Sequence, residues 1–454
     1  MTPFVVEFPD DWTPVFVFER MAARPGIIFF DSARPGKLAR YSFLAHDPLE
    51  SFVTRDATYG IDPFAEVSSR LAEMTAETIP GLPPFQGGAA GVLNYELGRC
   101  WEELPQPIFD EFELPACVIH IYPSVFAWDH EQQRGWWISH DKAAQRLWSE
   151  IEAGVKEPCA IEVSDQHVEI PLGVPQFDVT QDGISLHSNF TEQGYLDAVQ
   201  QVIEYIRAGD IFQANLSQRL RLPAKRSPVE QYLRLRDTNA APFAGYFAHD
   251  DWAVMSSSPE RFVELQHGIA STRPIKGTRK RATNPEANLY TRDELRESEK
   301  DQAENVMIVD LLRNDLSRVC EPGSIRVPEL CTIEEYATVT HLVSEVTGKL
   351  KRGHTFWDLL AATFPGGSIT GAPKIRAMEI ITELEQVARG PYCGSMFYCG
   401  FDGTADSNIL IRTMTQRYGM LHAPVGGGVV AQSIPAREYE ETWHKAQGML
   451  RALR

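Results

Sequence analysis

The chain has 454 residues, of which 43% are hydrophobic and 23% are charged, an ordinary composition for a globular protein. It carries 43 Lys and Arg against 62 Asp and Glu, so the net charge is −19. This balance argues against nucleic acid or a membrane as the main partner, because both require a basic surface. A protein with this net charge can still bind an anionic small molecule if its positive charges are gathered in one cleft.

The first residues and the cysteines indicate a cytoplasmic protein. Residues 1–12, MTPFVVEFPDDW, lack the basic and apolar regions of a secretory signal, and no run approaches the ~18 apolar residues of a membrane span. The seven cysteines are scattered without a CxxC pair, so neither a disulfide framework nor a zinc site is expected. We therefore expect a cytoplasmic location.

Residues 1–175 are expected to form a first part that is rich in short strands. Pro and Gly separate segments that favour β structure, and helices are predicted at 63–75 and 141–153. A polar stretch at 154–190 is predicted to cross to the second part. The β-favouring segments are PVFVFER (14–20), GIIFFDSA (26–33), GGAAGVLNYEL (87–97), ACVIHIYPSVFAWD (116–129) and GWWISH (135–140).

Residues 185–454 are expected to form a second part in which strands and helices alternate. Apolar residues at helical spacing and Pro/Gly signals predict its long helices. The mixture of antiparallel-looking strands with long helices favours the α+β class over a regular βαβ array. The long helices are predicted at roughly 191–209, 293–318, 373–387 and 436–452.

Two of these helices carry carboxylates beside an apolar face. Glu304 lies in ESEKDQAENVMIVDLLRNDLSRV (297–319), and Glu438 and Glu441 lie in REYEETWHKAQGML (437–450). Mg²⁺ takes one or two carboxylates, keeps several waters and completes its shell with the substrate's anion, so carboxylates from two helices would suit it. Solvated acidic faces are the alternative.

TFPGGSITGAPKIRAMEIITELE (363–385) is a Gly-rich loop that leads into a helix, with Pro373 near its first turn. Exposed N–H groups at a helix start bind anions. A Walker P-loop is excluded, because Ala372 and Pro373 stand where Lys and Ser or Thr would be required. A carboxylate-binding turn with a hydroxyl from Ser368 or Thr370 remains, as does a merely tight turn.

The third constellation is SNILIRTMT (407–415) followed by APVGGGVVAQS (423–433). Arg412 lies in a strand-like run, where it is expensive to bury unless its planar fork pairs with a carboxylate. The three consecutive glycines remove every Cβ, so a ligand can approach the backbone closely. An edge-strand arginine and a bulge are the alternatives.

The fourth constellation is STRPIKGTRK (271–280), preceded by MSSSPERFVEL (255–265). A hairpin-like turn between them could bring Glu260 and Lys276 to one site. Four cationic neighbours between residues 273 and 281 would lower the pKa of Lys276 and favour its neutral, nucleophilic form. A purely electrostatic or solvated lysine is the alternative.

Taken together, these stretches resemble the chorismate-utilising enzyme family over nearly the whole chain. The resemblance implies an α+β fold with large antiparallel sheets packed as a sandwich core and helices outside. Seven long motifs in family order are far more specific than any one of them. They are RPIKGT, AENVMIVDLLRNDLSRV, HLVSEV, FPGGSITGAPKIRAMEII, ILIRT, GGGVVA and EYEETWHKA.

The resemblance also implies how the substrate and a metal ion are held. Glu304 and Glu441 would hold Mg²⁺, which bridges to a carboxylate of chorismate. The other implied binding residues are Arg412, Tyr392, Gly427 and Gly428 at the enolpyruvyl carboxylate and His341 and Ser368 beside the ring end.

Within the family, the residue at position 276 separates two reactions. Aminodeoxychorismate synthases carry lysine there, and it resembles a nucleophile that attacks C2 of the ring while Glu260, the glutamate of SPERF, helps the C4 hydroxyl depart. Ammonia then adds at C4 and the lysine leaves, which gives 4-amino-4-deoxychorismate for p-aminobenzoate and folate synthesis. Anthranilate synthases generally have alanine, and anthranilate formation is the alternative.

Water addition is not expected from this chain. Isochorismate and salicylate synthases carry a lysine base in a KVVLAR-like strand, and the matching stretch FQANLSQR has Gln213 in its place. A glutamine cannot act as a general base for water at neutral pH. The resemblance therefore favours an amine-adding enzyme.

The first part of the chain resembles the family's tryptophan pocket. A bound tryptophan, structural or regulatory, is therefore implied. No glutamine amidotransferase segment is recognisable, so a separate glutaminase subunit is implied as the source of ammonia. The residues that align with the pocket are Ser32, Arg40 and Tyr41 in FFDSARPGKLARYSF and Pro242, Phe243 and Ala244 in APFAG.

Overall fold

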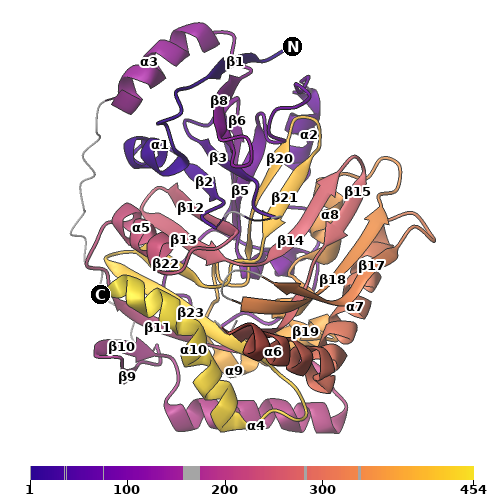
Figure 1. Ribbon diagram of the computed structural model, residues 1–454. Helices are drawn as coiled ribbons and strands as arrows, with labels where there is room; N and C mark the ends of the chain where they lie inside the picture. The colour runs from indigo at the N-terminus through magenta and orange to yellow at the C-terminus, as the bar shows by residue number, and fades with distance from the viewer. Residues whose placement is uncertain are drawn as a thin grey trace.

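Across the residues that the computed structural model describes, the strands form two large antiparallel sheets, of 13 and 10 strands (Figure 1). The α+β class and the packed antiparallel sheets implied by the resemblance are confirmed. Within the described part of the chain, no helix is long and apolar enough to cross a membrane. The described residues are 2–34, 36, 38–74, 76–156, 174–280, 284–335 and 339–454.

The 13-stranded sheet joins strands from both predicted parts of the chain, because β2 pairs with β12 from Ile28 opposite Phe247 to Asp31 opposite Ala244. Its order is β1 (Phe4–Glu7), β8 (Arg134–Ser139), β7 (Ser124–Asp129), β3 (Tyr41–Ala45), β2 (Ile28–Asp31), β12 (Phe243–His249), β13 (Trp252–Ser258), β22 (Thr413–Arg417), β23 (Met420–Val429), β11 (Gln213–Pro223), β10 (Ile184–Ser188) and β9 (Phe177–Gln181), with β19 (Gly371–Ala372) paired to β11.

The 10-stranded sheet also combines early and late strands, since β20 pairs with β5. The division predicted at residues 175–185 stays a prediction. The order of this sheet is β16 (Ile275–Lys280), β18 (Val339–Lys349), β15 (Ile269–Thr272), β14 (Arg261–Gln266), β21 (Ala405–Asn408), β20 (Ser395–Gly400), β5 (Gly88–Leu93), β6 (Cys117–Tyr122) and β4 (Glu50–Thr54), with β17 (Arg326–Glu335) paired to β18.

An apolar core lies between the two sheets, and both contribute to it. Phe43 and Val254 enter it from the first sheet, and Val92 and Met396 enter it from the second. Figure 1 shows α1 and α3 at one end of the molecule and α4 at the other. The helices are α1 (Pro14–Met21), α2 (Ala65–Glu73), α3 (Ala144–Lys156), α4 (Glu192–Ala208), α5 (Pro228–Thr238), α6 (Pro285–Glu297), α7 (Glu299–Val319), α8 (Phe356–Thr363), α9 (Lys374–Glu385) and α10 (Pro435–Leu453), with 3₁₀ turns η1 (Tyr95–Cys100) and η2 (Gly367–Ile369).

Away from the site, two sequence predictions of secondary structure are wrong. PVFVFER (14–20) is helical, because the Thr13 hydroxyl accepts the N–H of Phe16 at 3.2 Å and Pro14 starts the helix with its φ already set. The helix predicted at 293–318 is two helices, because Ser298 leaves helical geometry and caps α7. In the crossing predicted at 154–190, residues 157–173 lie outside the described residues.

Candidate active site

A cavity of about 500 Å³ lies between β16, β23, the η2 loop and helices α7 and α10. It collects residues that are far apart in the sequence and that come from both sheets. Of the predicted catalytic, substrate-binding and metal residues, the cavity is lined by Glu260, Lys276, Glu304, His341, Ser368, Tyr392, Arg412, Gly428 and Glu441.

Lys276 lies on β16, where it pairs with Leu342 of β18. Its Nζ lies 3.5 Å from the carbonyl oxygen of Ser368. Burial lowers the pKa of Lys276, the charges of Glu304 and Glu260 oppose that shift, and the charge of Lys445 adds to it. The direction agrees with the prediction, so a larger share of this amine is neutral at a given pH than for an exposed lysine.

For Arg273 and Arg279, the predicted cause of that pKa shift is wrong, and the side chain of Lys280 is not described. The arginines beside Lys276 are neutralised by carboxylates, so their charges do not act as free cations on the amine. Burial and Lys445 take that role instead, and Arg281 lies outside the described residues. The ion pairs are Arg273 with Glu329, Glu334 and Glu345 at 2.5–3.0 Å and Arg279 with Glu294 and Asp301 at 3.0–3.1 Å.

Glu260 stands directly before β14, and its carboxylate accepts a hydrogen bond from Ser368 Oγ at 3.0 Å. The β14–β15 hairpin brings it beside Lys276, as predicted. Burial raises the pKa of Glu260, although Lys276 and the Ser368 hydroxyl oppose the shift. A carboxyl group with a raised pKa beside an amine with a lowered pKa is suited to protonate a leaving group while the amine attacks.

The sequence predicted a strand at Arg412, and this prediction is wrong. The residue lies between β21 and β22 with a φ of 52°. Its guanidinium lines the cavity. Burial lowers the pKa of Arg412, and the charge of Glu260 opposes this shift. No described carboxylate forms an ion pair with it. A half-buried guanidinium without a partner fits a carboxylate ligand, which can accept two parallel hydrogen bonds.

The glycines of β23 allow other groups to approach its backbone. A Cβ at Gly428 would lie 2.6 Å from Gln213 Nε2, and one at Gly427 would lie 3.4 Å from Glu441 Oε1 and from Lys445 Nζ. Gly427 is not among the cavity-lining residues, because the side on which a Cβ would stand faces α10. The predicted backbone contact therefore has Gly428 in the cavity wall and Gly427 just behind it.

Two further predicted residues are held in uncharged forms. Burial and the nearby charge of Arg412 lower the pKa of His341 to about 4, so its imidazole is neutral at pH 7. Burial raises the pKa of Tyr392 well above its usual value, so its hydroxyl keeps its proton. Both side chains can therefore donate a hydrogen bond without carrying charge.

Glu304 and Glu441 reach the cavity from α7 and α10. Burial raises the pKa of Glu304, whereas at Glu441 the attraction and hydrogen bond of Lys445 outweigh burial and lower the pKa. Their oxygens are the donors that Mg²⁺ prefers. In the part of the chain that the structure describes, no three metal-ligating side chains converge into a complete set. The pair therefore fits an open site that takes its other ligands from water and substrate.

Sequence reasoning missed Lys445 and Asn215, which both line the cavity. Lys445 Nζ donates to the carbonyl of Gly426 at 2.9 Å and lies 2.7 Å from Glu441. Its spacing of four residues from Glu441 on one helix was the available signal. Asn215 lies opposite Gly428 across β11 and β23, and no local pattern reveals such a cross-strand neighbour.

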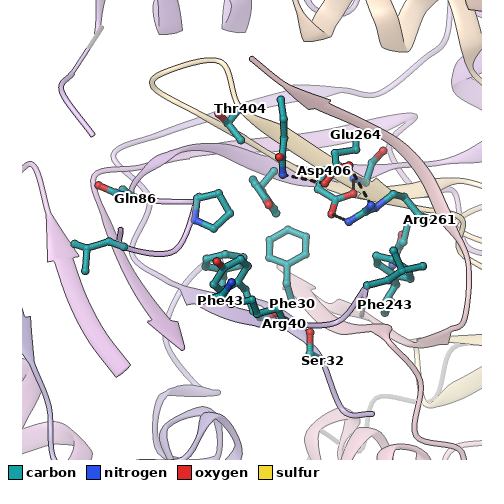
Figure 2. Close-up of a pocket in the computed structure, with 18 of the residues that line it drawn as sticks. Phe30, Ser32, Arg40, Phe43, Gln86, Phe243, Arg261, Glu264, Thr404 and Asp406 are labelled. Carbon is teal, nitrogen blue, oxygen red and sulfur yellow. Dashed lines mark hydrogen bonds and ion pairs between the residues drawn. The ribbon is translucent and has the colours of Figure 1, made fainter. Parts of the chain in front are cut away.

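A second cavity, of about 620 Å³, lies where β2, β3 and β12 approach β14, β20 and β21. Figure 2 shows the rings of Phe30, Phe43 and Phe243 around it. Edge-to-face contacts, such as that between Phe43 and Tyr398 at 5.2 Å, fix these rings. All six residues predicted for a tryptophan pocket line it: Ser32, Arg40, Tyr41, Pro242, Phe243 and Ala244.

The charged groups of this aromatic cavity are mostly paired. Arg40 binds Asp129 at 2.6 Å. Arg261 binds Asp406 at 2.8 Å and Glu264 at 3.1 Å (Figure 2). Sequence reasoning missed Asp31, which is 2% exposed. Its Oδ2 accepts from Tyr232 and Arg236, whereas its Oδ1 has no partner among the described residues.

Comparison with known proteins agrees with this arrangement. Residues 27–451 match the family of chorismate binding enzymes. The chain is 37% identical to aminodeoxychorismate synthase component 1 of Klebsiella aerogenes over 100% of this chain and 99% of that protein. It is also 37% identical to anthranilate synthase component 1 of Thermus thermophilus, over 97% and 95% of the two chains.

A solved structure of a family member has a similar fold. Anthranilate synthase component I from Streptococcus pneumoniae superposes with a TM-score of 0.76 at 30% identity, over 91% of this chain and 93% of that chain. Since the matched family covers almost the full length of the sequence, the chain belongs to the chorismate binding enzyme family.

Proposed function

We propose that this protein is component I of an aminodeoxychorismate synthase and converts chorismate and ammonia to 4-amino-4-deoxychorismate. The observation that carries the proposal is Lys276, a half-buried amine with a lowered pKa in the same cavity as Glu260. Relatives with the aminodeoxychorismate synthase name match the whole length of the chain. Relatives with the anthranilate synthase name match it nearly as well, so anthranilate formation is the second candidate.

The proposed reaction uses Lys276 as a nucleophile. Its neutral Nζ attacks C2 of the ring, the double bond shifts, and the C4 hydroxyl leaves with the proton of Glu260 as water. Ammonia then attacks C4, the double bond shifts back, and the bond between C2 and Nζ breaks. The excess proton of the attacking ammonia returns to Glu260. Chorismate and ammonia thus give the 4-amino product and one water.

The two carboxylates of chorismate have separate sites in this proposal. Arg412, which has no carboxylate partner in the described structure, binds the enolpyruvyl carboxylate together with Tyr392 and the backbone of Gly428. The ring carboxylate lies toward Glu304 and Glu441. Ser368 keeps the Glu260 carboxyl oriented toward the ring through its 3.0 Å hydrogen bond.

We propose Mg²⁺ as the cofactor, held by Glu304 and Glu441. When bound, the ion neutralises the ring carboxylate and fixes its position. Glu438 supports the site from α10, because it is buried, accepts a hydrogen bond from Ser433 at 2.6 Å and lies close to Gly427. Lys445 balances the charge of Glu441 at 2.7 Å, which keeps that carboxylate ionised.

Two further roles belong to the proposal. The aromatic cavity would bind tryptophan, with the indole among Phe30, Phe43 and Phe243 and the ammonium group at the unpartnered Oδ1 of Asp31. A separate glutaminase subunit would supply ammonia, as the name component 1 of the relatives suggests a partner component. A cytoplasmic location remains a prediction from the sequence.

A product assay tests the proposal. Purified protein is incubated with chorismate and ammonium chloride, with and without Mg²⁺, and the products are separated by chromatography. We expect a 4-amino product that keeps its enolpyruvyl group, made only with Mg²⁺. Lys276→Ala should lower its rate by about 10³-fold or more, because a covalent step is lost. Lys349→Ala, which removes a lysine paired with Glu321 on the surface, should be neutral. Fluorescent anthranilate from the unaltered protein would assign the second candidate instead.

A further inference from the structure

Arg389 lies behind the wall of the active-site cavity. Its side chain is not among the residues that line that cavity, and it lines a third cavity, of about 420 Å³, instead. The residue is 6% exposed, and its backbone N–H donates to Glu96 Oε1 at 2.9 Å. A buried guanidinium is costly unless its donors are satisfied, so the groups that accept from it indicate what it does.

The guanidinium of Arg389 donates to two backbone carbonyls of the active-site wall. Its Nη2 donates to the carbonyl oxygen of Asn215 at 2.6 Å, and its Nη1 donates to that of Ile369 at 3.2 Å. Asn215 lies on β11 and Ile369 ends the η2 turn, and both residues line the active-site cavity. One side chain therefore ties together two segments of the wall that are far apart in the sequence.

The same guanidinium lies between two tyrosine rings. Its Cζ is 5.8 Å from the ring centre of Tyr392 and 4.6 Å from that of Tyr95. A guanidinium near an aromatic ring is attracted by the negative face of that ring. Tyr392 also lines the active-site cavity, so Arg389 contacts three residues of the wall from behind.

Glu385 fixes the orientation of this guanidinium. Two hydrogen bonds join them, from Nε to Oε2 at 2.9 Å and from Nη2 to Oε1 at 2.6 Å. Glu385 is 3% exposed and is itself held by Ser217, whose backbone N–H and hydroxyl donate to it at 2.7 and 2.9 Å. Paired hydrogen bonds set the plane of the arginine fork, which a lysine ammonium cannot reproduce.

We propose that Arg389 is a positioning residue for chorismate: it holds Asn215, Ile369 and Tyr392 in the arrangement that receives the enolpyruvyl end of the substrate. The inference rests on the proposed function, in which Tyr392 and Arg412 bind the enolpyruvyl carboxylate. That carboxylate takes no part in the bond changes, so contacts to it are equally strong in the bound substrate and in the transition state. Loss of Arg389 should therefore raise KM for chorismate and leave kcat nearly unchanged.

Arg389→Lys tests the proposal, because it keeps a positive charge beside Glu385 but cannot also donate to both carbonyls. We expect KM for chorismate to rise about tenfold, with kcat within about threefold of the unaltered value. Arg99→Lys is the matched control. Arg99 is 7% exposed, lines the same third cavity and donates twice to the carbonyl of Pro105, which does not line the active site. Its substitution should leave KM for chorismate within about twofold.

A second variant allows the missing group to be returned. Arg389→Ala removes the guanidinium from the wall of the third cavity, where a guanidinium ion from solution can take its place. Guanidinium chloride at millimolar concentration should lower the raised KM of this variant by about threefold or more, whereas sodium chloride at the same concentration should not. A general loss of packing would not respond to one ion in this way.

Melting curves show which variants fold. If both single variants unfold, Arg389→Met combined with Glu385→Gln is measured instead, because it leaves no uncompensated charge buried. An unchanged KM for chorismate in a folded Arg389 variant, a fall in kcat alone, or an equal rise in KM for Arg99→Lys overturns the proposal. If the product proves to be anthranilate, the proposed function fails, but the role of Arg389 is still tested because that reaction also consumes chorismate.

Discussion

The active-site cavity and the aromatic cavity meet at two consecutive residues, Glu260 and Arg261. Glu260 lines the first and Arg261 lines the second. In the active site, Arg412 has no carboxylate partner in the described structure, and Lys276 is a half-buried amine with a lowered pKa. In the aromatic cavity, Arg261 is bound by two carboxylates and lies 5.2 Å from the ring of Phe243.

This difference separates a site built for reaction from a site built for binding. Unpaired charges are unfavourable in the empty protein, and an anionic substrate and its transition state relieve that cost. Most charges of the aromatic cavity are paired, so they and the rings stabilise the fold around the cavity that is proposed for tryptophan. The two neighbouring residues can therefore be substituted to test whether the division of roles holds.

Substituting the two glutamates of this segment should give the largest contrast. Glu260→Gln removes the proposed proton donor, so we expect kcat for the amination to fall about 10³-fold with little change in KM for chorismate. Glu264→Gln, four residues away in the aromatic cavity, should keep kcat within about threefold. Steady-state kinetics of both variants checks this. Equal losses in the two variants would mean that the segment acts through its structure rather than through Glu260.

Substituting arginines should give the next effect. Arg412→Met removes a guanidinium without a carboxylate partner, so we expect KM for chorismate to rise about 10²-fold, the loss of a charge-assisted pair with the substrate. Arg417→Met removes an arginine of β22 that pairs with Asp251 at the surface and should leave KM unchanged. Initial rates over a range of chorismate concentrations measure both. A fall in kcat alone for Arg412→Met would contradict its role in binding.

Most of the predicted site residues stand inside a motif of the sequence, such as Lys276 in RPIKGT and Arg412 in ILIRT, whereas Tyr392 does not. Glu260 and Lys276 were placed together correctly, since they are only 16 positions apart and the β14–β15 hairpin between them turns the chain back. Their electrostatics could not be predicted in the same way. The stretch 271–280 looks like a cluster of cations, but β17 and β18 bring in Glu329, Glu334 and Glu345, which neutralise Arg273. Pairing partners so far along the chain leave no mark on the local sequence.

The fold shows the same limit. The alternating Val and Phe of residues 14–20 fit a strand, yet Thr13 and Pro14 cap a helix whose Val17 and Phe18 become fully buried. Thr13 and Pro14 were a readable signal for the start of a helix, whereas the hydrophobic pattern wrongly predicted a strand. Asn215 is different, because its place beside Gly428 depends on the register of β11 and β23. Such contacts require the three-dimensional structure.

The smallest predicted effect concerns the aromatic cavity itself. Burial and the charges of Asp406 and Glu345 raise the pKa of Glu264 from 4.5 to about 7, against the attraction of Arg261 and Arg273. The folded state therefore binds a proton that the unfolded state releases between these values. As a result, the free energy of unfolding falls as pH rises from 4.5 to 7 and stays reduced above 7.

Glu264→Gln removes this pH-dependent loss, because the amide does not titrate. The measured quantity is the melting temperature of the variant minus that of the unaltered protein. We expect this difference to be about 2–4 °C higher at pH 8 than at pH 5. Thermal melts at the two values measure this, with Glu77→Gln at an exposed position as the control. If the ion pair with Arg261 dominated instead, Glu264 would be ionised at both values and the variant would lose stability equally at each. The presence or absence of this pH dependence therefore decides whether Glu264 holds a proton in the folded protein or is ionised by its pair with Arg261.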